Sequence, residues 1–211
     1  MKIFGMPIGM WLLFEQSFRE KLVTEIGTSR IEAGEITKRA HKKYCEIVEK
    51  LPEFEKDDRF KMNILSCAML AAFLLSLPEK PDVETVADYY REAMMTEPMK
   101  LFCRLSGKNK FTDNDISSLR ETAAKKAADR NPYSWNMDFL PYPDGSGYEA
   151  RFTKCGICFL MQELGLFEYV PAMCRLDYTM SDAGGATVFV REYTLASGGP
   201  YCDCGYRKKN I

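Results

Sequence analysis

The spacing of apolar residues changes near residue 130, and this change constrains the fold more than any other feature of the chain. Before it, apolar residues recur at helical spacing and prolines separate the segments. After it, residues 135–139 and 148–152 alternate apolar with other side chains. A period of 3.6 indicates helices, whereas a period of two indicates half-buried strands. The chain is therefore expected to join a helical part, residues 1–130, to an α/β part, residues 131–211.

Five helices are predicted in the first part, at residues 10–26, 30–51, 59–77, 82–95 and 112–128. Pro52 and Pro78 should end the second and third, because proline lacks the N–H that a helix interior needs. Pro98 should kink or divide the fourth helix before residue 105. Thr112 and Asp115 form an acidic variant of the capping box, which marks the start of the fifth helix. In the second helix, apolar residues recur at helical spacing from Ile31 to Leu51.

The second part contains the signals of a β-hairpin, because a turn sequence rich in proline and glycine, residues 141–147, separates two alternating segments. The other elements follow in order: helices at 156–164 and 169–180, a loop at 181–185, and strands at 187–193 and 201–207 joined by a turn at 197–200. The predicted fold class is α+β, with a helical N-terminal layer packed on a roughly four-stranded, mainly antiparallel sheet and two helices inserted between its hairpins. A single domain over residues 1–211 is expected.

The charge balance argues against some classes of partner. The formal net charge is -1, from 29 basic and 30 acidic residues, which favours neither nucleic acid nor an anionic membrane. The longest apolar stretch, residues 64–77, is too short to cross a bilayer and suits a buried helix. The apolar N-terminus has only Lys2 before it and no cleavage signal, so it is interpreted as a first helix. We therefore expect a cytoplasmic protein with reduced thiols, and a homodimer is favoured only because symmetric dimers are common.

The histidine and glycine content excludes several kinds of site. The single histidine, His41, lies between lysines on a polar helix face, which disfavours Ser-His-Asp and Cys-His catalysis. One histidine also excludes a histidine-rich metal site. The chain lacks a P-loop and a Gly-x-Gly-x-x-Gly motif, so a nucleotide-phosphate cradle is not supported.

Five of the eight cysteines lie between residues 148 and 208, at positions 155, 158, 174, 202 and 204. A thiolate zinc site is one interpretation, but the spacing departs from paired Cys-x-x-Cys knuckles. A redox Cys-x-x-Cys motif at a helix start is another, although the strand and helix order of thioredoxin is missing. Burial as small apolar side chains is the third. No metal or cofactor is predicted. Strand alternation should place Cys202 and Cys204 on one face and Asp203 on the other.

Acidic and basic residues accompany these thiols. Glu163 and Asp177 lie on the two inserted helices, and Asp203 lies in the last strand. An acid beside a thiol in a partly buried site can serve as a general base or bind an amidine. Arg191 and Arg175 could hold a carboxylate in a bidentate way. Ordinary surface ion pairs are the alternative interpretation for all of these residues.

The order of these motifs resembles the L-2-amino-thiazoline-4-carboxylic acid hydrolase family over the last third of the chain. The matching positions are Cys155, Glu163-Leu-Gly165, Cys174-x-x-Asp177, Arg191-x-x-Thr194-Leu-Ala, a glycine turn and Cys202-Asp203. The resemblance implies hydrolytic opening of a cyclic isothiourea whose C2 is amidine-like and which carries a carboxylate. Two positions depart from the family pattern: Cys204 replaces a phenylalanine, and Cys158 is additional.

The same resemblance suggests roles for individual residues. Candidate nucleophiles are Cys155, Cys174 and Cys202, and candidate acids that balance the amidine are Asp177 and Asp203. Arg191 would bind the substrate carboxylate, and Thr194 and Glu163 are further candidates for substrate binding. Attack by a thiolate and attack by an acid-activated water both stay open.

The end of the pattern is also similar to small-molecule-binding domains of the vinyl-4-reductase (4VR) type. A non-catalytic domain that binds a small molecule is therefore an alternative function, and a thiolate metal or redox protein is a second one. The expected partner in the first two cases is a small-molecule substrate or ligand.

Overall fold

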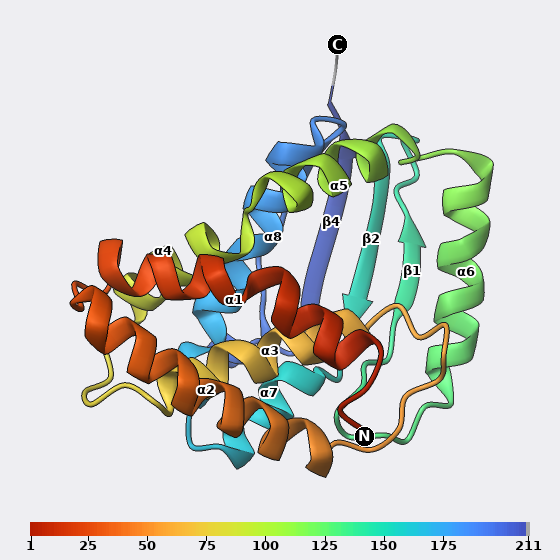
Figure 1. The fold of residues 1–211 in the computed structure, drawn as a ribbon. Coiled ribbons are helices and arrows are strands. Elements are labelled where there is room, and N and C mark those ends of the chain that lie inside the picture. Colours follow the sequence, from red (N-terminus) through yellow and green to blue (C-terminus); the bar gives the residue numbers. More distant parts are fainter. Residues whose placement is uncertain (210–211) are drawn as a thin grey trace. The chain divides into compact units, whose positions relative to one another are not determined.

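The computed structural model describes residues 1–209. Within them lie eight α-helices and a four-stranded antiparallel sheet, so the predicted α+β class is confirmed (Figure 1). The helices are α1 (Met6–Thr24), α2 (Arg30–Lys50), α3 (Lys61–Leu74), α4 (Val83–Met94), α5 (Glu97–Lys108), α6 (Asp113–Ala127), α7 (Gly156–Glu163) and α8 (Val170–Gly184). Two 3-10 helices are η1 (Phe167–Tyr169) and η2 (Leu195–Ser197), and the strands are β1 (Asp138–Pro141), β2 (Gly147–Phe152), β3 (Thr187–Val190) and β4 (Cys202–Lys208).

The chain forms two compact units. Residues 1–96 and 156–173 make up the helical unit, and residues 97–155 together with the described residues from Cys174 onward make up the sheet unit. Helix α8 therefore begins in the helical unit and continues in the sheet unit. The expectation of one domain for the whole chain stays a prediction.

Helix α3 is the centre of the helical unit. It packs against α1, α2 and α7, and every residue from Ile64 to Leu74 is buried (Figure 1). The Phe73 ring lies 5.0 Å from the Phe18 ring and 5.7 Å from the Trp11 ring. This burial confirms the prediction that the longest apolar stretch forms a core helix. Burial on all sides also explains why α3 has no polar face.

Local signals set the helix boundaries as expected. Ser29, Asp82 and Thr112 cap α2, α4 and α6, each accepting a hydrogen bond from a backbone N–H in the first helical turn. Pro98 lies in the first turn of α5, so the predicted division of the fourth helix is confirmed. The apolar spacing of α2 corresponds to a buried face that includes Ile36, Ala40 and Tyr44, whereas Ile31 in the first turn is 84% exposed.

The sheet of the second unit has the strand order β1-β2-β4-β3, and all neighbours are antiparallel. Figure 1 shows β1, β2 and β4 side by side, with α6 running along the β1 edge. The β1–β2 pair is the predicted hairpin, and Phe139 lies opposite Ala150 in its register. Its turn places Gly145 at φ 69°, in the left-handed region that glycine adopts readily.

Two predicted boundaries near the end of the chain were wrong. Residues 181–184 continue helix α8 instead of forming a loop, and Gly185, at φ 73°, follows directly after the helix. Ser181 is buried there, and its hydroxyl contacts the Thr187 hydroxyl at 2.6 Å. Strand β3 ends at Val190, three residues before the predicted end. Backbone amides beyond it bond the Asp203 side chain rather than a neighbouring strand.

The apolar helices are short. Within residues 1–209, no helix has both the length and the hydropathy that crossing a membrane requires.

Candidate functional site

Three alternating side chains of β4 form one wall of the candidate site in the sheet unit. Cys202 and Cys204 are 8% and 9% exposed, and Tyr206 follows on the same face. Asp203 lies on the opposite face, where the register pairs it with Arg151. The predicted separation of the two cysteines from the intervening acid is therefore confirmed, because successive strand side chains point to opposite faces.

The part of α8 that belongs to the sheet unit contributes a thiol and an acid. Cys174 and Asp177 are one helical turn apart, so their side chains share one side of the helix. Arg191, the first residue after β3, donates from Nη1 to Asp177 Oδ2 at 2.7 Å. The ion pair joins the end of a strand to the middle of the helix.

Arg191 makes further contacts around this ion pair. Its Nη2 donates to the backbone carbonyl of Cys174 at 2.6 Å, and Nη1 lies 3.9 Å from Cys204 Sγ. The guanidinium carbon lies over the rings of Phe189 and Tyr178, at 5.0 and 5.3 Å from their centres. Only 6% of the Arg191 side chain is exposed. These contacts fix the guanidinium from the helix, the strand and both rings.

Asp177 is held at one oxygen. Arg191 occupies Oδ2, and within the described sheet unit Oδ1 has no hydrogen-bonding partner. Of the Asp177 side chain, 42% is exposed to solvent. Burial nevertheless raises the pKa of this carboxyl above its ordinary value, and the charge and hydrogen bond of Arg191 oppose the rise. The group is thus an accessible acid whose pKa is raised, and a raised pKa favours proton transfer near neutral pH.

The thiols near this acid are protonated at neutral pH. Burial raises the pKa of Cys174 to about 12, and it also raises the pKa of Cys202 and Cys204. The positive charge of Arg191 opposes this effect for Cys174, while the charge of Asp177 adds to it. A thiolate nucleophile would therefore need a base to take its proton.

Cys202 differs from the other two thiols in one contact. The backbone N–H of Leu195, at the start of η2, lies 3.2 Å from Cys202 Sγ and lowers the pKa of the thiol against the larger effect of burial. Cys155 is the last residue before the chain leaves the sheet unit, and its charge would raise the pKa of Cys174 and Cys202. The thiols of Cys174 and Cys202 are therefore close enough to both Cys155 and Asp177 to respond to their charges.

Asp203 and Thr194 lie outside this group. The Asp203 carboxylate accepts hydrogen bonds from the backbone amides of Glu192 and Tyr193, at 2.9 and 2.6 Å. Thr194 caps η2 by accepting from the backbone N–H of Ser197 at 3.1 Å. Both contacts shape the segment between β3 and β4.

The predicted site residues thus fall into three sets. Asp177, Arg191 and the three candidate cysteines lie together, Asp203 and Thr194 order the adjacent segment, and Glu163 ends α7 in the helical unit. Cys204 was not among the predicted site residues, although its sulfur contacts Arg191. The alternation that placed it beside Cys202 was the signal that could have identified it.

All eight cysteines are free thiols in the described chain. Residues 1–209 contain no group of three or more histidine, cysteine or acidic side chains arranged to hold a metal ion. His41 is exposed, and its ring lies 4.7 Å from the Trp11 ring.

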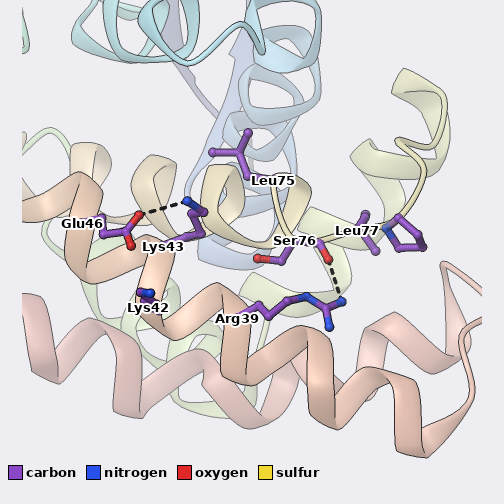
Figure 2. Close-up of a pocket in the computed structure, with 8 residues that line it drawn as sticks. Arg39, Lys42, Lys43, Glu46, Leu75, Ser76 and Leu77 are labelled. Carbon is purple, nitrogen blue, oxygen red and sulfur yellow. Dashed lines mark hydrogen bonds and ion pairs between the residues drawn. The ribbon is translucent and has the colours of Figure 1, made fainter.

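A cleft lies in the helical unit, between α2 and the residues that follow α3, and its volume is about 470 Å³. Figure 2 shows Arg39 and Lys43 among the residues that line it. Arg39 donates to the backbone carbonyl of Ser76 at 3.0 Å, and Lys43 pairs with Glu46 at 3.0 Å. The lining residues include no cysteine, histidine or aspartate. The cleft therefore offers mainly cations, together with the carboxylate of Glu46 and the hydroxyl of Ser76.

The comparison with protein families agrees with the motif order. Residues 62–206, more than half of the chain, match the L-2-amino-thiazoline-4-carboxylic acid hydrolase family, and the chain belongs to this family. The match starts in α3 and ends in β4, so it extends well before the last third in which the sequence motifs lie. No curated protein and no solved structure gives a significant match. Family membership supports a hydrolase-like function.

Proposed function

We propose that this protein hydrolyses a cyclic amidine or isothiourea of the 2-amino-thiazoline carboxylate type, opening the ring at a carbon–nitrogen bond. Family membership supports the reaction class. The single observation that carries the proposal is the state of Asp177, whose Oδ2 is fixed by Arg191 while Oδ1 is unoccupied within the sheet unit and the side chain is accessible. A carboxylate held in this way can bind an amidinium group and exchange a proton with it.

The reaction requires a nucleophile at the amidine-like C2 of the ring. In one route a water molecule attacks C2 and gives its proton to Asp177. In the other, a thiol among Cys155, Cys174 and Cys202 gives its proton to Asp177, attacks C2, and is later displaced by water. The water route involves fewer steps, because no thiol has to be displaced afterwards. Burial also raises the pKa of Cys174 and Cys202, which disfavours the thiolate that the other route requires.

The remaining steps are shared by both routes. The tetrahedral centre at C2 collapses, the bond from C2 to the ring nitrogen breaks, and Asp177 returns the proton to the departing nitrogen. One water molecule is consumed in the net reaction, and the product carries a free amine and a carbamoyl group on sulfur. Asp177 thus serves first as base and then as acid, which suits a carboxyl with a raised pKa.

The test is incubation of the purified protein with L-2-amino-thiazoline-4-carboxylate, with ring opening followed by mass spectrometry as the gain of one water. The Asp177→Asn variant should lose about 100-fold or more in kcat, as expected for loss of a general base. Variants Cys155→Ala, Cys174→Ala and Cys202→Ala separate the two routes, because only the thiol route requires one particular sulfur. Cys45→Ala, in α2 of the helical unit, is the matched control.

Identification of the products shows which bond of the ring breaks. A thiol reagent should detect no new small-molecule thiol, since the proposed bond breakage leaves the sulfur carbamoylated. Release of a thiol would show that the carbon–sulfur bond breaks and would contradict that part of the proposal. Stabilisation of the folded protein by the compound without turnover would contradict the hydrolase and favour a binding protein.

A further inference from the structure

We infer that Arg191 is a positioning residue, which orients the Asp177 carboxylate through contacts to that carboxylate and to the Cys174 carbonyl, rather than a receptor for the carboxylate of the substrate. This inference rests on the proposed function, because it assigns Arg191 a role in the same reaction. It reverses the role that the sequence motif suggested for this side chain.

The hydrogen bonds of the guanidinium are the first part of the argument. A guanidinium has five N–H donors. One on Nη1 bonds Asp177 Oδ2 at 2.7 Å, one on Nη2 bonds the Cys174 carbonyl at 2.6 Å, and Nη1 also approaches Cys204 Sγ at 3.9 Å. Both terminal nitrogens therefore have partners within the protein. The remaining N–H groups belong to a side chain of which only 6% is exposed, so a substrate carboxylate has little access to the usual bidentate contact.

The two strong contacts lie one helical turn apart on α8. By holding the Cys174 carbonyl and the Asp177 carboxylate together, Arg191 fixes the carboxylate relative to the backbone of its own helix. This arrangement leaves Oδ1 as the oxygen that can reach a ligand. Misplacing a reacting group by about 1 Å can slow a reaction by about 100-fold, so this orientation matters for catalysis.

Aromatic packing keeps the arginine itself in place. Its guanidinium lies over the rings of Phe189 and Tyr178, which contact each other edge to face at 4.8 Å. With 6% of its side chain exposed, Arg191 is enclosed, whereas Asp177, with 42%, is accessible. The Asp177 carboxylate is thus accessible to solvent, while the enclosed Arg191 guanidinium holds it in position.

The charges that face Asp177 give the arginine a second role. On α8 the neighbouring titratable groups are Cys174 and Tyr178, from β4 they are Cys202, Cys204 and Tyr206, and Cys155 acts on Cys174 and Cys202. All of these groups are neutral when protonated, and Arg191 is the positive charge that acts on Asp177. Burial raises the pKa of Asp177, and Arg191 limits the rise. Removing the arginine should therefore raise the pKa further.

The experiment measures the Asp177 pKa directly by NMR of protein labelled with carbon-13 at its aspartate carboxyls, and Asp177→Asn identifies the signal. In Arg191→Met the pKa should rise by about one to two units, as expected for loss of an adjacent opposite charge. Arg191→Lys should restore most of the shift because it restores the charge. Arg207→Met, which removes an exposed arginine of β4, is the control and should leave the Asp177 pKa unchanged.

Kinetics distinguish positioning from substrate binding. A positioning role predicts that Arg191→Met lowers kcat by about 10- to 100-fold and changes KM little. The low-pH limb of the rate profile should move to higher pH together with the Asp177 pKa. A substrate-binding role predicts a large rise in KM with the pH profile unmoved, and that result would overturn the inference. Arg191→Lys should recover the pH profile more fully than kcat, since a lysine keeps the charge but not the two-nitrogen contact.

Two readouts keep the test decisive if a variant fails to fold or the substrate is wrong. Nitrogen-15 NMR of the wild-type guanidinium should show separate, slowly exchanging Nη1 and Nη2 signals, and a freely rotating group would refute the inference. If the Asp177 pKa responds to Arg191→Met while the wild-type protein opens no ring, the proposed function fails but the coupling of the two residues stands. An unchanged pKa in a folded Arg191→Met variant refutes the inference itself.

Discussion

Gly107 of α5 lies directly against the backbone of Gly184 at the end of α8, and a methyl group added to Gly107 would lie 2.2 Å from the Gly184 carbonyl oxygen. Backbone atoms cannot move aside as a flexible side chain can. We therefore expect Gly107→Ala to lower the free energy of unfolding by about 2 to 3 kcal/mol, because overpacking of close contacts costs amounts of this size. Urea denaturation measures the change.

The control for this prediction is Gly34→Ala. Gly34 lies inside α2, and an added methyl group there meets no atom within 4 Å. Alanine is the better helix former, so this variant should gain about 0.5 to 1 kcal/mol. A Gly107→Ala variant as stable as the wild type would show that the two helices can separate at low cost.

A buried ionic group beside α6 predicts how stability depends on pH. Asp129 accepts hydrogen bonds from Lys126 at 2.7 Å, from Ser134 at 2.7 Å and from the backbone N–H of Asn131 at 2.8 Å. Burial would raise the pKa of Asp129, but these partners outweigh it and hold the pKa at about 2. A depressed pKa contributes stability above the unfolded value near 4, and this contribution disappears as the pH falls from about 4 to 2. Its size is about 2 to 3 kcal/mol.

Asp129→Asn tests this expectation. The variant should be less stable than the wild type by about 2 to 3 kcal/mol at neutral pH. The difference should shrink towards zero near pH 2, where the wild-type carboxylate is also protonated. Denaturant titrations of both proteins across this range give the answer. A difference that does not change with pH would contradict the assigned ionisation.

The helices and the hairpin could be predicted from the sequence because their signals are local. Caps such as Thr112 and stops such as Pro52 act on the residues next to them, and alternation places Cys202 and Cys204 on one face. The continuation of α8 to Gly184 could not be predicted, since Ser181 and the two glycines indicate a loop. It is the non-local burial of Ser181 against Thr187 that favours the helix there.

The site could be predicted only as a set of residues, not as a geometry. Spacing along α8 placed Cys174 and Asp177 on one side, but nothing local indicated that Arg191 would bond both of them. A motif gives the order of charged groups along the chain. It does not tell whether an arginine faces a ligand or a neighbouring carboxylate.

Asp203 is expected to act through the backbone. Its carboxylate accepts hydrogen bonds from the backbone amides of Glu192 and Tyr193. Asp203→Ala should therefore speed hydrogen exchange at these two amides by about tenfold or more. This change corresponds to a fall of at least about 1.4 kcal/mol in the free energy of local opening. Turnover should fall less than in Asp177→Asn, because the effect reaches the site through the segment after β3. A loss of turnover as large as that of Asp177→Asn, with both amides still protected, would instead make Asp203 a catalytic residue.

The sign of the coupling between Asp177 and the thiols gives the last prediction. The charge of Asp177 raises the pKa of Cys174, Cys202 and Cys204, in addition to the larger effect of burial. Asp177→Asn removes this charge, so alkylation of Cys202 by iodoacetamide near pH 8.5 should become faster, by about 2- to 10-fold, since one pKa unit is a tenfold change in thiolate. Peptide mass spectrometry measures the rate at each cysteine, and Cys45 is the internal reference. Slower alkylation in the variant would mean that Asp177 draws the proton from the thiol, which is the behaviour that the thiolate route requires.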